Sequence, residues 1–379
     1  MQRVPVLNPD GSPAMPTKAS RARRWLKEGK AKVLHNDLGI FQIQLIAEPS
    51  GHNYQDVVIG IDSGKLFTGI AVQTAKSTLL MLHLVLPFKI VTDRMTTRRM
   101  MRRTRRARRV IRTICFKLRN HRQKRFSNRR QKGLPPSINA NKLLEQRVIT
   151  ELRKIYPVSH FVYEIVKANG TKSFSPVMVG QLQQIAWLKS QLPTEVLEGW
   201  KTSILRRELG LLKNKTDKSA QEPATHAVDG VALAASHFIQ YKIDRINRSA
   251  NWIGDVKLNN SPFVVISRPP YSRRQLHLLQ FSKGGERRAY GGSTTINNFR
   301  KGDLILYKSK DKNIVGYCSG STGKSLSISD ANWSRLGRFA ASKCQILSRS
   351  CGLVVKAQTL TAIPLATIPK VSGSNLAEA

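Results

Sequence analysis

Acidic residues are scarce in this sequence. Its 379 residues include 23 Asp and Glu against 64 Lys and Arg, which gives a formal net charge of +41. Such an excess of positive charge repels itself, so a polyanionic partner is expected, and nucleic acid is the best candidate. A membrane surface is the weaker alternative, because the sequence has no long apolar run and no isolated amphipathic basic helix at a terminus.

Cysteine is also scarce, with four residues and no C-x-x-C pair. This spacing argues against a structural zinc site and favours a reduced, cytoplasmic protein. The first residues lack the apolar segment of a signal peptide, so none is expected.

Two of the rare acids follow apolar runs. Asp62 follows Val57–Ile61, and Glu164 follows Phe161–Tyr163, so each is predicted at the end of a buried strand. A carboxylate in such a place is costly unless a positive charge compensates it. Taken alone, Asp62 could be an ordinary turn-initiating aspartate and Glu164 could pair with a basic helix.

A histidine and a third acid stand together later in the chain. His226 and Asp229 lie three residues apart in a predicted helix over residues 224–241, so both should project from one face. A lone histidine is more often structural, but this one accompanies Asp229 in a chain that also has Asp62 and Glu164. The four residues together predict a cage for divalent cations that acts on a phosphodiester.

The third feature is a basic segment over residues 94–130. The sequence has no acid between Asp93 and Glu145. It also has no Gly or Pro between Asp93 and Gly133, so a long helix is predicted. Its simplest partner is a nucleic-acid backbone, bound through charge and counterion release. A disordered basic arm is the alternative, although interspersed apolar residues argue against it. The residues expected to contact RNA are Arg98, Arg99, Arg102, Arg103, Arg105, Arg106, Arg108 and Arg109.

Basic residues recur in the later part of the chain, among short apolar runs separated by Gly-containing turns. Arginine side chains often recognise guanine edges, whereas backbone N–H groups and many lysines hold phosphates. A solvated basic surface is the alternative. The candidates for DNA contact are Arg273, Arg274, Arg287 and Arg288.

The pattern of apolar runs and turns predicts an α/β protein made of several segments. These are an N-terminal unit of strands and one basic helix (1–55), a strand, turn and return strands (56–92), the basic helix region (93–140), alternating helices and strands (141–257), a β-rich module (258–357) and a poorly ordered tail (358–379).

Several motifs resemble those of the IscB and IsrB proteins, in the same order along nearly the whole chain. Pro13–Pro16 is similar to their P-L-M-P element, with Ala14 in place of Leu. The Arg-rich segment resembles their bridge helix. The remaining resemblances are Gly60–Val72, Tyr163–Glu164 and His226–Asp229 to the three RuvC motifs, and Arg273–His277 and Phe299–Asp303 to the C-terminal domain.

The resemblance implies an RNase H-like RuvC domain with an inserted bridge helix, an N-terminal PLMP-type domain and a C-terminal domain that interacts with the target-adjacent motif. It also implies a transposon-associated, omega-RNA-guided DNA endonuclease. The partners would be a guide RNA and target double-stranded DNA, without a membrane or a required protein partner. The location would be a prokaryotic cytoplasm, on the nucleoid when the protein is bound to DNA.

The interval between the second and third RuvC-like motifs distinguishes the two protein types. IscB carries an HNH nuclease domain there, whereas Ile165–Thr225 contains neither histidine nor cysteine and cannot build that metal site. The pattern therefore resembles IsrB, and implies a nick in the displaced, non-target strand.

The residue types suggest a mechanism. Asp62, Glu164 and Asp229 are expected to hold two Mg²⁺ ions, and His226 to orient or deprotonate the attacking water. Two alternatives remain open: a structure-selective RuvC-like nuclease that needs no RNA, and an RNA-binding scaffold that is catalytically silent.

Overall fold

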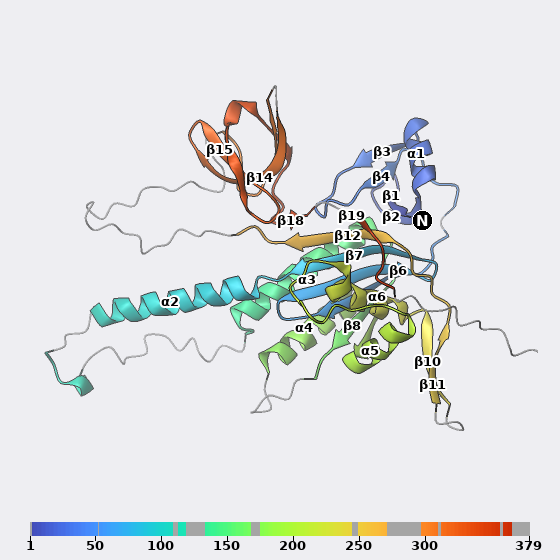
Figure 1. Cartoon of the computed structure of the whole chain (residues 1–379), viewed down its shortest axis with the longest axis horizontal. Coiled ribbons are helices and arrows are strands. Elements are labelled where there is room, and N and C mark those ends of the chain that lie inside the picture. The colour runs from blue at the N-terminus through green and yellow to red at the C-terminus, as the bar shows by residue number, and fades with distance from the viewer. Residues whose placement is uncertain are drawn as a thin grey trace, which may run out of the picture. The chain divides into compact units, whose positions relative to one another are not determined.

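The computed structural model describes residues 2–51, 53–108, 113–118, 133–167, 175–244, 249–270, 297–309, 312–356 and 359–365 (Figure 1). The chain divides into two compact units. Unit 1 comprises Met1–Leu86, Lys142–Ser267 and Val355–Ala379, and unit 2 comprises Pro87–Asn141 and Arg268–Val354. Within the described ranges, no helix is both long enough and apolar enough to cross a membrane. The elements form a mixed α/β protein with several sheets.

Unit 1 begins with a small four-stranded sheet in the order β2-β1-β4-β3. One helix, α1, packs on it, and the small core includes Val4, Ala22 and Ile43. The predicted strands and basic helix of this segment are confirmed. The elements are β1 (Arg3–Leu7), β2 (Pro13–Lys18), α1 (Ala19–Lys27), β3 (Ala31–Leu34) and β4 (Gln42–Leu45).

The main sheet of unit 1 has eight strands in the order β18-β12-β7-β6-β5-β8-β9, with β19 also paired to β12. The successive strands β5, β6 and β7 are antiparallel, whereas β8 runs parallel to β5 and β9 parallel to β8. The strands are β5 (Val58–Ser63), β6 (Phe67–Thr74), β7 (Ser77–Val85), β8 (His160–Ile165), β9 (Thr194–Glu198), β12 (Ser261–Ser267), β18 (Val354–Val355) and β19 (Thr359–Thr361).

Four helices accompany this sheet in the chain: α3 (Pro136–Ile155), α4 (Pro176–Gln191), α5 (Gly199–Glu208) and α6 (Val228–Ala235). A π-helical turn, Pro223–Ala227, leads into α6. The predicted helix over 224–241 is therefore too long, because Ile239–Asp244 forms strand β10 and pairs with β11 (Ser249–Gly254). The β-branched and aromatic residues of this segment suit a strand better than a helix.

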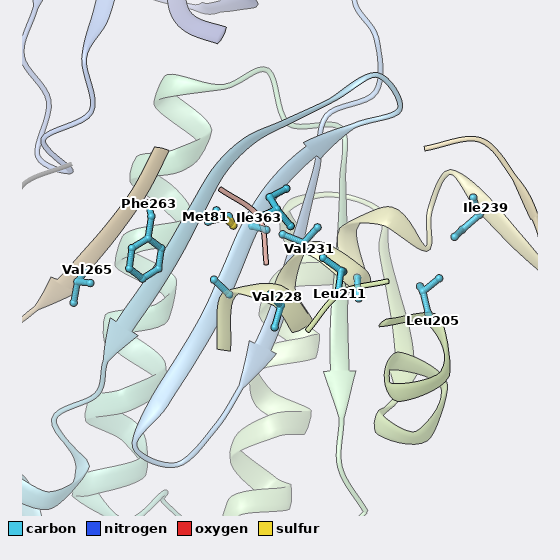
Figure 2. Packing of buried hydrophobic residues seen from close by; sticks show 12 residues of the cluster. Met81, Leu205, Leu211, Val228, Val231, Ile239, Phe263, Val265 and Ile363 are labelled. Atoms are coloured by element: carbon cyan, nitrogen blue, oxygen red, sulfur yellow. The ribbon is translucent and has the colours of Figure 1, made fainter. Parts of the chain in front are cut away.

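Helix α6 packs closely on the middle of the sheet because glycines face each other at the contact. A Cβ atom at Gly60 of β5 would lie 2.1 Å from the carbonyl oxygen of Gly230, so any side chain there would displace the helix. Figure 2 shows part of the core at this contact, where Val228 and Val231 lie among apolar residues of the sheet and of later segments. This packing brings the first turn of α6 to the sheet.

Unit 2 contains α2 (Phe88–Arg108) and a five-stranded antiparallel sheet in the order β16-β15-β14-β13-β17. The predicted long basic helix is present but shorter, because Phe116–Leu118 forms a 3-10 turn. Unbroken like charge opposes continuation of a helix, since residues three and four apart repel. The strands are β13 (Leu304–Lys308), β14 (Asn313–Thr322), β15 (Ser325–Ser329), β16 (Arg335–Ala340) and β17 (Cys344–Ser348).

Two expectations about the last third of the chain are wrong. Strand β12, predicted to open the β-rich module, lies in the main sheet, parallel to β7. Its continuous apolar run suits a strand that is covered on both faces. The predicted tail is ordered at its start, because Thr359–Thr361 pairs with β12 and Ile363 is buried in the main core.

Candidate active site

The parallel strands β5 and β8 bring two of the predicted acids to one edge of the sheet. Asp62 and Glu164 each occupy the penultimate position of their strand. The preceding residues, Ile61 and Tyr163, are register partners, so the two carboxylates follow the same step of the ladder. Side chains at the carboxyl ends of neighbouring parallel strands form the usual ligand-binding edge of such sheets.

The π-helical turn and α6 bring the other two residues to this edge. Asp229 lies in the first turn of α6, and His226 lies in the preceding π-helical turn. Gly69 of β6 is the register partner of Asp62, and a Cβ atom at Gly69 would lie 1.9 Å from the backbone oxygen of His226. As a result, the Nδ1 atom of His226 is 3.9 Å from the Oδ2 atom of Asp62.

The carboxylate of Asp62 is close enough to Glu164 and Asp229 to affect both of them. Burial raises the pKa of Glu164 to about 7, and the charges of Asp62 and Asp229 act in the same direction. Burial also raises the pKa of Asp229, again with a contribution from Asp62. Carboxylates that repel one another and are partly removed from water favour a bound cation. The positive charge would offset both the repulsion and the loss of hydration.

Two basic side chains neutralise Asp229, which is only 2% exposed. The Nη1 atom of Arg206 donates to Oδ1 over 2.5 Å, and the ammonium group of Lys213 donates to Oδ2. The sequence alone did not single out Arg206 or Lys213. No local pattern predicts these two ion pairs, because Arg206 and Lys213 precede Asp229 by 23 and 16 residues.

His226 has a defined tautomer in its neutral form. Its Nε2 atom lies 3.0 Å from the carbonyl oxygen of Lys218. A carbonyl can only accept, so Nε2 carries the proton and Nδ1 has a free lone pair that faces Asp62. The rings of Phe67 and His83 lie 5.3 Å from that of His226, between centroids, and enclose it on the side of the sheet.

The donor set suits a hard divalent cation. Asp62, Glu164 and Asp229 supply only carboxylate oxygens, which are the ligands that Mg²⁺ prefers. A Cβ atom at Gly199 would lie 2.8 Å from Oε1 of Glu164, so the absence of a side chain there leaves room for this carboxylate. The residues present therefore fit the predicted cation.

A buried polar network supports the strand that carries Asp62. The ammonium group of Lys142 donates to Ser63 Oγ over 2.6 Å and to Glu145 Oε2 over 2.9 Å. The hydroxyls of Ser63 and Thr68 donate to Glu145 Oε1 over 2.6 and 2.7 Å. Burial is the largest single influence on Lys142 and acts to lower its pKa, but the charges of Glu145 and Tyr163 and the hydrogen bonds to both together raise it.

The predicted RNA-contacting arginines lie on or just beyond α2. Arg98, Arg99 and Arg103 are exposed on the helix. The other helical members of the set are Arg102, Arg105, Arg106 and Arg108. Arg109 and the predicted DNA contacts Arg273, Arg274, Arg287 and Arg288 lie outside the described residues.

Asp303, the last residue of the segment Phe299–Asp303, has a structural role. Asp303 is fully buried and accepts hydrogen bonds from the backbone N–H groups of Arg300 and Ser350, each over 2.8 Å. The guanidinium of Arg349 donates to it over 3.0 Å. Asp303 thus holds the turn before β13 against the segment after β17.

Comparison with known proteins relates the first half of the chain to a family. A search of curated proteins found no match to the sequence. Residues 4–183 match the family described as RRXRR protein, a segment that runs from β1 into α4 and contains Asp62 and Glu164 but precedes His226 and Asp229.

Proposed function

We propose that this chain is an omega-RNA-guided DNA endonuclease of the IsrB type, which nicks the non-target strand in an RNase H-like RuvC site. The observation that carries the proposal is the convergence of Asp62, Glu164 and Asp229, with His226, at one edge of the main sheet. The RRXRR family is found in IscB- and IsrB-type nucleases, which supports the same function.

The proposed site assigns metal ligation to the three carboxylates. Two Mg²⁺ ions held by Asp62, Glu164 and Asp229 would activate the attacking water and stabilise the leaving oxygen. Glu164 must lose its proton to act as a ligand, so its raised pKa makes the site weaker in acid.

His226 serves as the general base in this proposal. The Lys218 carbonyl holds the proton on Nε2, so the Nδ1 lone pair can take a proton from water beside Asp62. His83, which lies behind His226, is buried, and burial together with the charge of His226 lowers its pKa to about 4. His83 therefore stays neutral at physiological pH and does not compete for the proton.

The basic surfaces supply nucleic-acid binding. Exposed arginines of α2 would grip the phosphates of the guide RNA and its duplex with the target strand. Base pairing with the guide would select the sequence, while the protein reads duplex shape and a short flanking motif. The later arginines Arg273, Arg274, Arg287 and Arg288 are candidates for reading that motif.

A catalytically silent RNA-binding scaffold is the second candidate function. It is favoured by Arg206 and Lys213, which already bond to both oxygens of Asp229. In an active site, a divalent cation would compete with these side chains for the same oxygens. Only a measurement of cleavage separates the two functions.

The test uses the protein purified with an RNA transcribed from its flanking DNA and a duplex that matches the guide. Cleavage is measured with Mg²⁺ for the wild type and for Asp62→Asn, Glu164→Gln and a control, Glu48→Gln, which changes an exposed acid outside the site. We expect cleavage by the wild type and the control only, with RNA binding unchanged in all four. Full activity in Asp62→Asn would disprove the metal-site assignment, and RNA binding without any cleavage would favour the scaffold.

A further inference from the structure

The main sheet has a second cluster of metal-ligating side chains at the edge opposite the proposed active site. Asp56, His160 and His237 each offer a ligand atom, and these atoms all lie within 4.8 Å of one another. Asp56 precedes β5, His160 is the first residue of β8, and His237 follows α6. The cluster thus joins three segments that are far apart in the sequence.

Each imidazole lies near a different oxygen of Asp56. The Nδ1 atom of His160 lies 3.9 Å from Oδ1 of Asp56, and the Nε2 atom of His237 lies 3.9 Å from Oδ2. The two rings are 4.3 Å apart between centroids. Ligand atoms around a tetrahedral Zn²⁺ with bonds of about 2.0–2.1 Å lie roughly 3.4 Å apart. The three ligand atoms, which lie within 4.8 Å of one another, would therefore have to approach by up to about 1.4 Å to complete the site.

A further carboxylate orients one of the histidines. The Nδ1 atom of His237 lies 2.9 Å from Oε1 of Glu195, on β9. A carboxylate can only accept when ionised, so this contact places the proton of the neutral ring on Nδ1 and leaves the Nε2 lone pair toward Asp56. A carboxylate behind a histidine ligand is the usual second layer of a zinc site.

The other histidine can also present a lone pair. The Oγ atom of Ser159 lies 3.0 Å from Nδ1 of His160 and 3.3 Å from the carbonyl oxygen of Val57. Rotation of this hydroxyl toward Val57 frees Nδ1 for a metal ion. The side chain of Asp56 is 54% exposed, which provides an entry path and room for a water ligand.

We infer that Asp56, His160 and His237 bind one Zn²⁺ or a similar borderline divalent cation. Two imidazole nitrogens and one carboxylate oxygen suit Zn²⁺, Co²⁺ or Ni²⁺, whereas Mg²⁺ prefers oxygen ligands alone. The scarcity of cysteine argued against a zinc site, but this set needs none. Two of the chain's 23 acids, Asp56 and Glu195, are placed here in a protein of net charge +41.

The site has a structural consequence for the proposed active site. Each ligand lies near one end of an element whose other end carries a carboxylate: β5 carries Asp62, β8 carries Glu164 and α6 carries Asp229. Asp62 follows Asp56 by six positions along a largely extended segment, which is about 20 Å. The bound cation would therefore fix these elements without touching the nucleic acid, and its binding can be measured independently of cleavage.

The test is Zn²⁺ binding by the full chain, stripped with a chelator and studied by calorimetry in excess Mg²⁺. Excess Mg²⁺ occupies the carboxylate site and leaves the imidazole site available. We expect one Zn²⁺ per wild-type chain and an affinity at least about 100-fold lower for His160→Gln and for His237→Gln. Glu195→Gln should weaken binding by about 10–100-fold, because it removes only the orienting carboxylate.

Two controls make this test decisive. His35→Gln removes an exposed histidine outside the cluster, and Asp62→Asn alters only the other edge of the sheet, so both should retain wild-type Zn²⁺ affinity. Zn²⁺ should also raise the melting temperature of the wild type and the controls but not of the ligand variants. Wild-type affinity in both His160→Gln and His237→Gln, or no bound Zn²⁺ in the wild type, would overturn the inference. Co²⁺ absorption with a thiolate charge-transfer band would overturn it too, by placing the metal on cysteine.

Discussion

The Nδ1 atom of His226 lies 3.9 Å from Oδ2 of Asp62, although the two residues are 164 positions apart in the chain. The backbone of His226 rests against Gly69, the register partner of Asp62, so the distance depends on direct contact between helix and sheet. On the other side of the ring, the Lys218 carbonyl 3.0 Å away determines which nitrogen carries the proton.

His226→Ala is expected to slow cleavage by about 10²–10⁴-fold, the usual contribution of a general base. Single-turnover rates with saturating Mg²⁺ measure the effect. Metal and RNA affinities should remain unchanged, because His226 is not a proposed ligand for either. A loss of Mg²⁺ affinity that accounts for the whole effect would instead make His226 a metal ligand.

The protein should nick one strand of a matched duplex. In the proposed function, one RuvC-like site without an HNH insertion would give one nuclease centre per chain. Labelling each strand separately, and comparing the products on a denaturing gel, measures which strand is cut. Efficient cleavage of both strands by a monomeric complex would contradict the nickase proposal.

Replacing Arg99 and Arg103 with Ala should weaken RNA binding and flatten its salt dependence. The two side chains are exposed and lie one turn apart on α2, so they present charge from one face. The slope of log K against log salt should fall by up to about two, one for each lost phosphate contact. The matched control replaces two exposed lysines of unit 1, Lys76 and Lys189. Equal slopes for the wild type and the Arg99, Arg103 double variant would place this face of α2 away from the RNA.

Acid should destabilise the metal-free protein through His83. Burial and the charge of His226 lower its pKa from 6.5 to about 4, so the unfolded chain binds more protons between these pH values. The stability that depends on neutral His83 is present above pH 6.5 and is lost as the pH falls to 4, with an upper limit of about 3 kcal/mol.

His83→Phe removes this titration while keeping a ring beside Phe67, 5.1 Å away in the wild type. The Thr225 hydroxyl next to His83 retains acceptors in the carbonyls of Ala220 and Glu222. Urea unfolding at several pH values should show a flatter profile for His83→Phe and an unchanged one for His35→Gln. If His83→Phe keeps the wild-type slope, another group controls the acid sensitivity.

Glu145→Gln should reduce the free energy of unfolding by about 3–5 kcal/mol, because it leaves the buried ammonium of Lys142 without its counter-charge. Glu151→Gln on the same helix is the control. Its partners Arg147 and Lys154 are 43% and 64% exposed, so the cost should stay within about 1 kcal/mol. Adding Lys142→Met to Glu145→Gln should recover part of the loss. Similar costs for Glu145→Gln and Glu151→Gln would show that the buried pair adds little.

Local sequence patterns were sufficient where an element is defined by its own residues. The apolar run before Asp62 and the Gly-containing turn after it predicted the β5–β6 hairpin, and the run before Glu164 predicted β8. Local sequence patterns did not predict the position of strands that pair with distant parts of the chain. Strand β12 joins β7 across some 180 residues, and Thr359–Thr361 pairs with β12, which lies about 100 residues earlier in the chain.

The sequence by itself singled out Asp62, Glu164 and Asp229 as site candidates, because acids are rare in this chain and these follow or interrupt apolar runs, and it added His226 because it lies beside Asp229. Only the tertiary structure decided what surrounds them: Arg206 and Lys213 on Asp229, the Lys218 carbonyl on His226, and the Asp56, His160 and His237 cluster at the opposite edge. Runs of charged or apolar residues can be recognised from consecutive positions in the sequence. The contacts at both edges depend on strand register and on the close approach of α6 at Gly60, which join residues far apart in sequence.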